Sequence, residues 1–160
     1  MVGVKELADI RLLREFSPVY RKQLARMTRE QHYQSGDCIF REGQSERQIY
    51  IVAEGQVVLE IRVPQLGTVQ VHRVGHGSLL GWSPILGHGT MTATARALTD
   101  CRLIVLDADE VRALAERDAR FGMEFFRTLS TALAERLRAT RLQLPDPRMR
   151  QTLGLCEGAD

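Results

Sequence analysis

Three histidines in the middle of the chain are the first residues whose chemistry could serve a metal site: His72, His76 and His88. A histidine and carboxylate site inside β structure needs two histidines at alternate positions, on one face of a strand. None of the three follows another by two residues, and glycines flank both His76 and His88. We therefore expect no metal site.

The chain also lacks the sequence patterns of common catalytic sites. It contains no nucleophile elbow, Walker loop or Rossmann glycine motif, so we expect a protein that is not an enzyme. Cys38, Cys101 and Cys156 are an odd number without a CxxC pair, which argues against a disulfide framework, a zinc site or an iron–sulfur cluster. This cysteine usage favours a reducing compartment, and we expect a cytoplasmic protein.

Composition and charge exclude several function classes. The 160 residues are 44% hydrophobic and 26% charged, which is typical of one globular domain. Twenty-two basic residues nearly balance 20 acidic ones, so the chain has no overall electrostatic pattern of a nucleic-acid-binding protein. No stretch approaches 18 apolar residues, and we expect no membrane span. A locally basic C-terminal end is better explained as a solvated or docking surface; its arginines are Arg136, Arg138, Arg141, Arg148 and Arg150.

Apolar periodicity divides the chain into three zones. Up to residue 29, apolar side chains recur every three or four positions, which predicts two amphipathic helices separated at Ser17-Pro18, a cap followed by a proline. Residues 31–106 hold short β-rich runs between glycines, which predicts an antiparallel sandwich or jelly roll. The runs lie at 38–40, 49–52, 57–61, 69–72, 91–97 and 103–106, and residues 53–56 predict a tight hairpin.

Helical periodicity returns between residues 107 and 144. Asp107 and Asp118 are the predicted caps of a short helix and of a long helix of about 25 residues, which Pro145 and Pro147 end. The long helix has apolar residues spaced as in a coiled-coil seam. Packing on the chain's own sheet is one explanation; we expect pairing with a second subunit as well, in a homodimer. The expected dimer contacts are Phe126, Leu129, Leu133 and Leu137.

Glycines and apolar residues between positions 35 and 57 follow a specific order: Ser35-Gly36-Asp37, Ile39-Phe40, Glu42-Gly43, Tyr50-Ile51-Val52 and Gly55-Gln56-Val57. This order resembles the front half of the cyclic nucleotide-binding domain, as in the Crp/Fnr regulators, and the resemblance extends through residue 144. It implies a mainly β fold, an antiparallel β-roll (double-stranded β-helix or jelly roll) with N-terminal helices and a long C-terminal helix. The expected domain is 1–144, with helices in 1–29, the β-roll in 31–106 and helices in 107–144.

In that family the ligand sits in a phosphate-binding cassette, a glycine-rich turn and short helix followed by a strand, which corresponds here to residues 77–97. Helix N-termini and consecutive backbone N–H groups attract anions. Ser83-Pro84 would cap the short helix and preset its first turn. The resemblance therefore implies that the ligand contacts Gly81, Trp82, Ser83, Met91, Thr92 and Ala93.

Two cassette side chains depart from the family pattern. Nucleotide-binding members have a glutamate that accepts from the ribose 2′-hydroxyl where this chain has Trp82, and a phosphate-pairing arginine where it has Met91. A hydrogen bond to a charged group contributes about 1.5–3 kcal/mol, so we expect weak binding of cAMP or cGMP. Trp82 either stacks on a planar ligand or belongs to the core. Arg96 either replaces the missing charge or is a solvated arginine.

Thr140 and Arg141 align with the positions where family members touch the purine, with an ordinary helix-surface role as the alternative. We expect a non-catalytic regulatory module that senses a nucleotide or another small anionic ligand and signals to a partner protein. One alternative is a protein-interaction module with a decayed pocket. Another is the effector part of a Crp/Fnr transcription regulator. Residues 145–160 are too few for a winged helix-turn-helix, so we expect no DNA binding by this chain alone.

Overall fold

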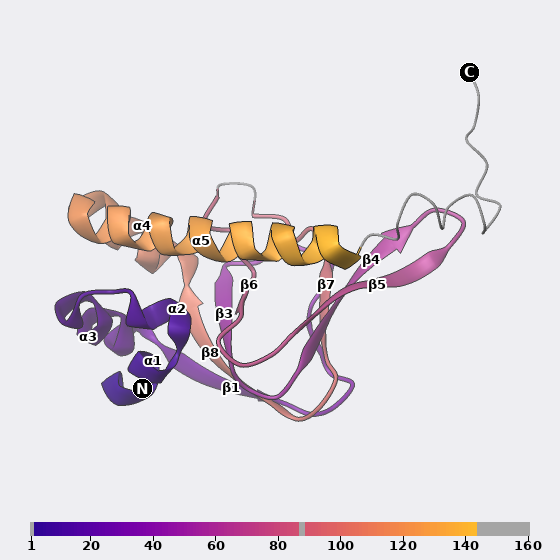
Figure 1. Cartoon of the computed structure of the whole chain (residues 1–160), viewed down its shortest axis with the longest axis horizontal. Helices are drawn as coiled ribbons and strands as arrows, with labels where there is room; N and C mark the ends of the chain where they lie inside the picture. Colours follow the sequence, from indigo (N-terminus) through magenta and orange to yellow (C-terminus); the bar gives the residue numbers. More distant parts are fainter. Residues whose placement is uncertain (1, 87–88, 144–160) are drawn as a thin grey trace, which may run out of the picture.

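Two four-stranded antiparallel sheets form the centre of the computed structural model, which describes residues 2–86 and 89–143 (Figure 1). The strand order is β1-β8-β3-β6 in the first sheet and β2-β7-β4-β5 in the second. The sheets form the β-roll that the glycine-separated runs predict. The strands are β1 (Arg29–Tyr33), β2 (Cys38–Phe40), β3 (Gln48–Glu54), β4 (Val57–Val63), β5 (Gly67–Val74), β6 (Leu79–Leu80), β7 (Thr94–Ala97) and β8 (Cys101–Asp107).

The central strands β3 and β8 of the first sheet are buried on both faces. Successive side chains of a strand point to opposite faces, and in β3 these faces meet two different apolar clusters. Ile49 and Ile51 pack among the helices, whereas Tyr50 and Val52 pack between the two sheets. This double burial explains why β3 is an apolar run rather than an alternating one.

The predicted hairpin at residues 53–56 is wrong, because β3 and β4 belong to different sheets. Gly55 instead carries the chain from one sheet to the other with φ +89°, and a Cβ there would lie 2.4 Å from the carbonyl oxygen of Asp100. The hairpin of this region joins β4 to β5, and Gln65 has φ +66° in its turn. The segment 91–97 contributes only the four residues of β7 to a strand.

Three helices precede the first strand, where the sequence predicts two: α1 (Val4–Asp9), α2 (Arg11–Arg14) and α3 (Pro18–Met27). Ile10, with φ −77° and ψ 114°, is extended and separates α1 from α2. The predicted start at Ser17-Pro18 is confirmed, since the Ser17 hydroxyl accepts from the backbone N–H of Tyr20 at 3.5 Å.

The two C-terminal helices begin at their predicted caps. Asp107 accepts from two backbone N–H groups at the start of α4 (Ala108–Arg117). Asp118 accepts from the backbone N–H groups of Arg120 and Phe121 at the start of α5 (Ala119–Gln143). The hydrogen bond from Phe121 lowers the pKa of the Asp118 carboxyl below its ordinary value. The predicted end of the long helix, at residues 144–147, lies outside the described residues.

Helix α5 runs along the β-roll, with the N-terminal helices beside its first half (Figure 1). Phe16 packs against Phe121 and Phe125 of α5, each at a ring-centroid distance of 6.2 Å. An ion pair joins Arg11 of α2 to Glu135 of α5. The long helix is therefore fixed to its own subunit along one face. None of the helices in the described part of the chain combines the length and apolarity needed to cross a bilayer.

Candidate functional site

The cassette residues named from the sequence surround one small cavity. Gly81, Trp82 and Ser83 come from the segment after β6, and Met91, Thr92 and Ala93 come from the segment before β7. The cavity has a volume of about 20 Å³, which is the space of about one water molecule. Its other walls are Phe40, Leu59, Leu80 and Arg136. The structure thus brings the six predicted residues together, around a space too small for a nucleotide.

Backbone packing holds the start of the cassette tightly. Gly81 has φ +68°, and a Cβ there would lie 3.0 Å from the carbonyl oxygen of Gln48 and 3.2 Å from Cδ2 of Tyr50. The short helix predicted after it is a turn over residues 83–86 in the described part of the segment. The carbonyl of Trp82 accepts from the backbone N–H groups of Ile85 and Leu86, so this turn begins one residue before the predicted Ser83 cap.

The floor of the cavity is apolar where the family has a phosphate-pairing arginine. Met91 is 3% exposed and packs in the core between the sheets, together with Tyr50 and Leu80. Burial raises the pKa of the Tyr50 hydroxyl, which donates to Oε1 of Gln48 at 3.1 Å. Neither side chain offers positive charge to an anion. The strand side of the cassette therefore supplies backbone groups and the Thr92 hydroxyl only.

Positive charge reaches the cavity from α5 instead. The guanidinium carbon of Arg136 lies 4.5 Å from the ring centroid of Trp82. Nη2 of Arg136 donates to the carbonyl oxygen of Leu79, and Nη1 is buried without a hydrogen-bond partner. Burial lowers the pKa of Arg136 to about 10, so the side chain remains a cation at neutral pH. Trp82 therefore stacks on a planar cation of the chain itself.

Sequence reasoning counted Arg136 only among the arginines of a basic helix end. A pattern that points to its position is nevertheless present in the sequence. Arg136 follows Leu129 by seven residues and Phe125 by eleven, so it lies on the face of α5 that is buried against the roll. An arginine at a buried position of an amphipathic helix needs a specific environment, because burying an isolated charge is costly.

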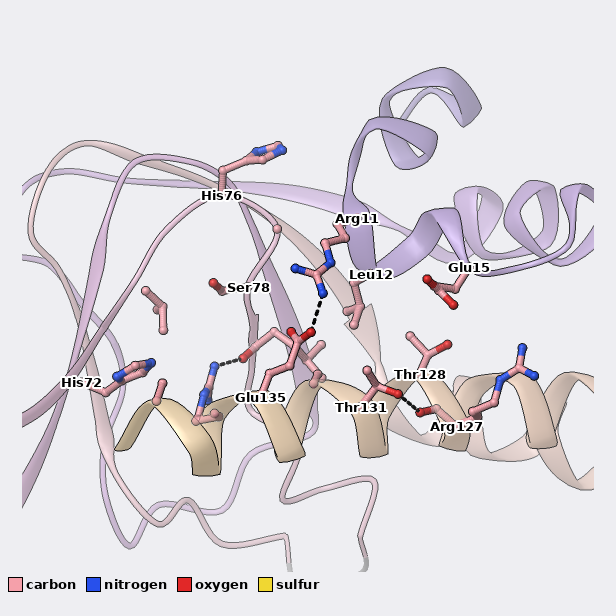
Figure 2. A pocket seen from close by; sticks show the side chains of 16 residues that line it. Arg11, Leu12, Glu15, His72, His76, Ser78, Arg127, Thr128, Thr131 and Glu135 are labelled. Carbon is pink, nitrogen blue, oxygen red and sulfur yellow. Dashed lines mark hydrogen bonds and ion pairs between the residues drawn. The ribbon is translucent and has the colours of Figure 1, made fainter. Parts of the chain in front are cut away.

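A larger cavity lies on the other side of Arg136. It has a volume of about 380 Å³ and is enclosed by α2, by the end of β5 with the segment that follows it, and by α5 (Figure 2). The ion pair between Arg11 and Glu135 crosses it, and Thr131 donates to the carbonyl oxygen of Arg127 on its helical wall (Figure 2). Because Arg136 lines both spaces, its side chain forms the wall between them.

The remaining candidate ligand contacts lie elsewhere. Arg96 donates to the carbonyl oxygen of Gly36 at 3.0 Å and pairs with Glu60 at 3.5 Å, so it does not replace the cassette arginine. Thr140 is exposed and donates to the carbonyl oxygen of Arg136 within the helix. Arg141 belongs to α5, but its side chain lies outside the described residues.

The four expected dimer contacts divide between two faces of α5. Leu129 is 3% exposed within the subunit's own core, and Leu133 packs partly against that core, so Leu129 cannot face a partner. Phe126 is 40% exposed and Leu137 is 53% exposed. Met123, which is 68% exposed and was not among the expected contacts, lies three residues before Phe126 on the same exposed side of α5. Met123, Phe126 and Leu137 thus form an exposed apolar stripe.

Of the three histidines considered from the sequence, the structure describes His72 and His76, and His88 lies outside the described residues. Nδ1 of His76 lies 2.7 Å from the carbonyl oxygen of Ala53. Among the side chains that the structure describes, no group of three or more His, Cys, Asp or Glu residues has the arrangement of a metal site.

Comparison with known proteins agrees with this architecture. The chain is 27% identical over 145 residues to a CRP-like cAMP-activated global transcriptional regulator of Mycobacterium tuberculosis, which covers 90% of the chain and 57% of that protein. It is 30% identical over 95 residues to a cGMP-dependent protein kinase of Caenorhabditis elegans, covering 59% of the chain and 11% of the kinase. The chain therefore spans less than two thirds of either relative.

Solved structures show the same fold. A cyclic nucleotide-binding domain from Methylobacillus flagellatus superposes with a TM-score of 0.78 at 18% identity, covering 88% of this chain and 79% of that one. The catabolite activator protein of Thermus thermophilus has a TM-score of 0.69 at 27% identity, covering 83% and 61%. Residues 30–118 match the family model of the cyclic nucleotide-binding domain, and the chain belongs to this family.

Proposed function

We propose that this chain is a non-catalytic regulatory module, which senses a nucleotide or another small anionic ligand at the cassette and signals to a partner protein through α5. The observation that carries the proposal is the direct contact between the cassette and α5. Arg136 of the helix stacks on Trp82 and donates to the carbonyl oxygen of Leu79, two residues in the first part of the cassette. A change at the ligand site therefore acts on the helix without an intermediate element.

The small volume of the cassette cavity determines how a ligand could bind there. A volume of about 20 Å³ does not admit a nucleotide, so a ligand that binds there must displace the Arg136 side chain. The free form and the bound form then differ in how α5 is held against the roll. A ligand shifts such an equilibrium only by its difference in affinity for the two forms. The partner protein would recognise α5 or the surface that α5 covers.

The relatives' names suggest cAMP and cGMP as the first ligands to test. Trp82 and Met91 remove two charged contacts of the family pattern, each of which contributes about 1.5–3 kcal/mol. We therefore propose that affinity for these nucleotides is at least about 100-fold below that of members with both contacts, since 1.4 kcal/mol corresponds to tenfold. An anion of different shape is then the better candidate ligand.

We also propose a homodimer through α5. Met123, Phe126 and Leu137 are exposed apolar residues on one stripe, and their spacing is that of a coiled-coil seam. Exposed apolar residues scattered singly are ordinary, but an aligned stripe along a helix favours a partner helix. The stripe lies away from the face that holds Arg136.

Calorimetric titration with cAMP, cGMP and cyclic di-GMP tests the sensing role, and hydrogen exchange of α5 with and without the bound nucleotide tests the coupling. We expect weak binding of at least one nucleotide together with altered exchange in the second half of α5. Binding without any change in α5 would contradict the signalling route. Absence of binding by all three would contradict nucleotide sensing.

One observation favours a second function, a protein-interaction module whose pocket has decayed. The cavity is too small for a nucleotide, and its wall includes the buried apolar side chain of Met91. In that case none of the nucleotides binds, and the exposed stripe of α5 is the functional surface. A third candidate, the effector part of a Crp/Fnr regulator, has the support of the 27% identical transcriptional regulator, which is longer than this chain.

A further inference from the structure

Arg136 is a partly buried cation that has no anionic partner among the described side chains. Its contacts are a π face, that of Trp82, and a carbonyl oxygen, that of Leu79. None of the ion pairs among the described side chains includes Arg136, and its Nη1 atom is buried with no hydrogen bond. A buried guanidinium with an unsatisfied donor favours the arrival of an anion.

Arg102 shows how the same protein treats an arginine whose role is structural. The Arg102 side chain is 20% exposed and lies within 4 Å of the carboxylates of Glu6, Glu30 and Glu54. The hydrogen bonds that Arg102 donates to Glu54 and Glu6 raise its pKa. Arg136 has the opposite environment, because burial without a carboxylate lowers its pKa. Among the described side chains, Arg136 therefore lacks the carboxylate partners that Arg102 has.

The groups around Arg136 suit a phosphate. Gly81, with φ +68°, lies just before the turn over residues 83–86, and the hydroxyl-bearing residues Ser83 and Thr92 line the same cavity. Backbone N–H groups and hydroxyls bind phosphate oxygens, and the planar fork of a guanidinium binds two of them at once. The cassette itself offers no such fork to the cavity, since Met91 is apolar and Arg96 pairs with Glu60.

We propose that Arg136 binds the phosphate group of the ligand, and so supplies from α5 the charge that the cassette itself lacks. This inference rests on the proposed function, because it concerns the same site. Binding requires the guanidinium to leave the ring of Trp82. The cavity of about 380 Å³ that Arg136 also borders gives the side chain room to move (Figure 2).

Trp82 is the only tryptophan of the chain, so its fluorescence reports on the site directly. The experiment titrates the wild-type protein with inorganic phosphate, cAMP and cGMP at constant ionic strength, with chloride as the reference salt. The same titrations use Arg136→Gln, Arg136→Lys and a matched control, Arg138→Gln, which removes an exposed charge from the same helix. The shift of the unfolding temperature by each probe gives a second readout that does not depend on the tryptophan.

We expect saturable fluorescence changes in the wild type and in Arg138→Gln. Arg136→Gln should lose affinity by about 10- to 100-fold, the range of one charge-assisted hydrogen bond. The affinity of Arg136→Lys should lie between those of the wild type and Arg136→Gln, because lysine keeps the charge without the planar fork. Circular dichroism verifies that each variant is folded, and Arg136→Lys provides the test if Arg136→Gln is not.

The outcomes separate this inference from the proposed function. If phosphate binds through Arg136 but no nucleotide binds, the inference is supported and nucleotide sensing fails. If a nucleotide binds equally to the wild type and to Arg136→Gln, the sensing role is supported and the inference fails. Tighter binding by Arg136→Gln would also overturn the inference, because it would show that Arg136 only blocks the cavity. No response of the wild type to any probe contradicts both.

Discussion

Alanine at position 81 tests whether the cassette backbone is as tightly packed as the structure shows. Gly81 has φ +68°, in the left-handed region that disfavours a side chain. The added Cβ would lie 3.0 Å from the carbonyl oxygen of Gln48, 3.2 Å from Cδ2 of Tyr50 and 3.3 Å from Cε of Met91. Since ordinary contact begins at 3.4 Å, all three neighbours must move.

The expected loss of stability has two parts. The left-handed conformation costs alanine about 1–2 kcal/mol, and extra volume at a packed site costs about 1–3 kcal/mol. Lower entropy of the unfolded chain offsets about 0.4–1 kcal/mol of this. We expect Gly81→Ala to lower the free energy of unfolding by about 2–4 kcal/mol. Gly67 is the matched control, because it has φ +79° and no atom within 4 Å of its would-be Cβ. Its alanine variant should lose only about 1 kcal/mol.

Urea unfolding followed by far-ultraviolet circular dichroism measures both variants. Equal m-values would show that the comparison concerns stability rather than a changed unfolded state. A loss in Gly81→Ala no larger than that in Gly67→Ala would refute the close approach of the cassette to β3. The same variant should bind phosphate less well, because the Cβ would displace Met91 or β3 beside the site.

Three further predictions concern the helices. Leu137→Glu should convert a dimer to a monomer in gel filtration with light scattering, whereas Leu66→Glu, in the β4–β5 turn, should not; a monomeric wild type would exclude the proposed dimer. Asp118→Asn should make the free energy of unfolding depend less on pH at acid pH. The hydrogen bond from Phe121 lowers the pKa of Asp118, so the carboxylate's stabilisation is present above its ordinary pKa of 3.8 and is lost as the pH falls through the lowered value; an unchanged acid limb in urea unfolding would contradict this. Asp107→Ala should lower the free energy of unfolding by about 1 kcal/mol through loss of a helix cap, with the m-value unchanged.

Local patterns were sufficient to predict most elements, because helices and strands bury apolar residues at different periods. Both caps of α4 and α5 and the start of α3 follow from short sequence signals. The polar strand β1 is absent from the predicted runs, since pairing with β8 rather than apolar periodicity defines it. The error at residues 53–56 has a long-range cause, because two adjacent runs with a glycine between them can pair or can enter opposite sheets. The contact of Gly55 with Asp100 decides between these, and it joins residues 45 positions apart.

The site was predictable in its cassette half only. Resemblance placed six residues around one cavity because they are close in sequence and share a known order. Arg136 enters from a helix 54 residues after Trp82, and its role depends on the rotation of α5 against the roll. Arg96 satisfied the strand-alternation rule but pairs with Glu60 on the adjacent strand β4. Alternation fixes the face of a residue, and tertiary packing fixes which residues meet across that face.

Because Arg136 lies on α5 and not on the cassette strand, an anion that binds it would act directly on the position of α5. A cassette arginine keeps the charge contact within the β-roll, whereas Arg136 joins the contact to a helix of 25 residues. Leu137, in the proposed dimer stripe, is the next residue along that helix. Because neighbouring residues of a helix move together, a shift of α5 that accompanies displacement of Arg136 also alters the proposed dimer surface. Ligand affinity and dimer affinity would then be linked, and linkage is reciprocal: a phosphate that binds through Arg136 should change the dimer dissociation constant by the same factor by which dimerisation changes phosphate affinity.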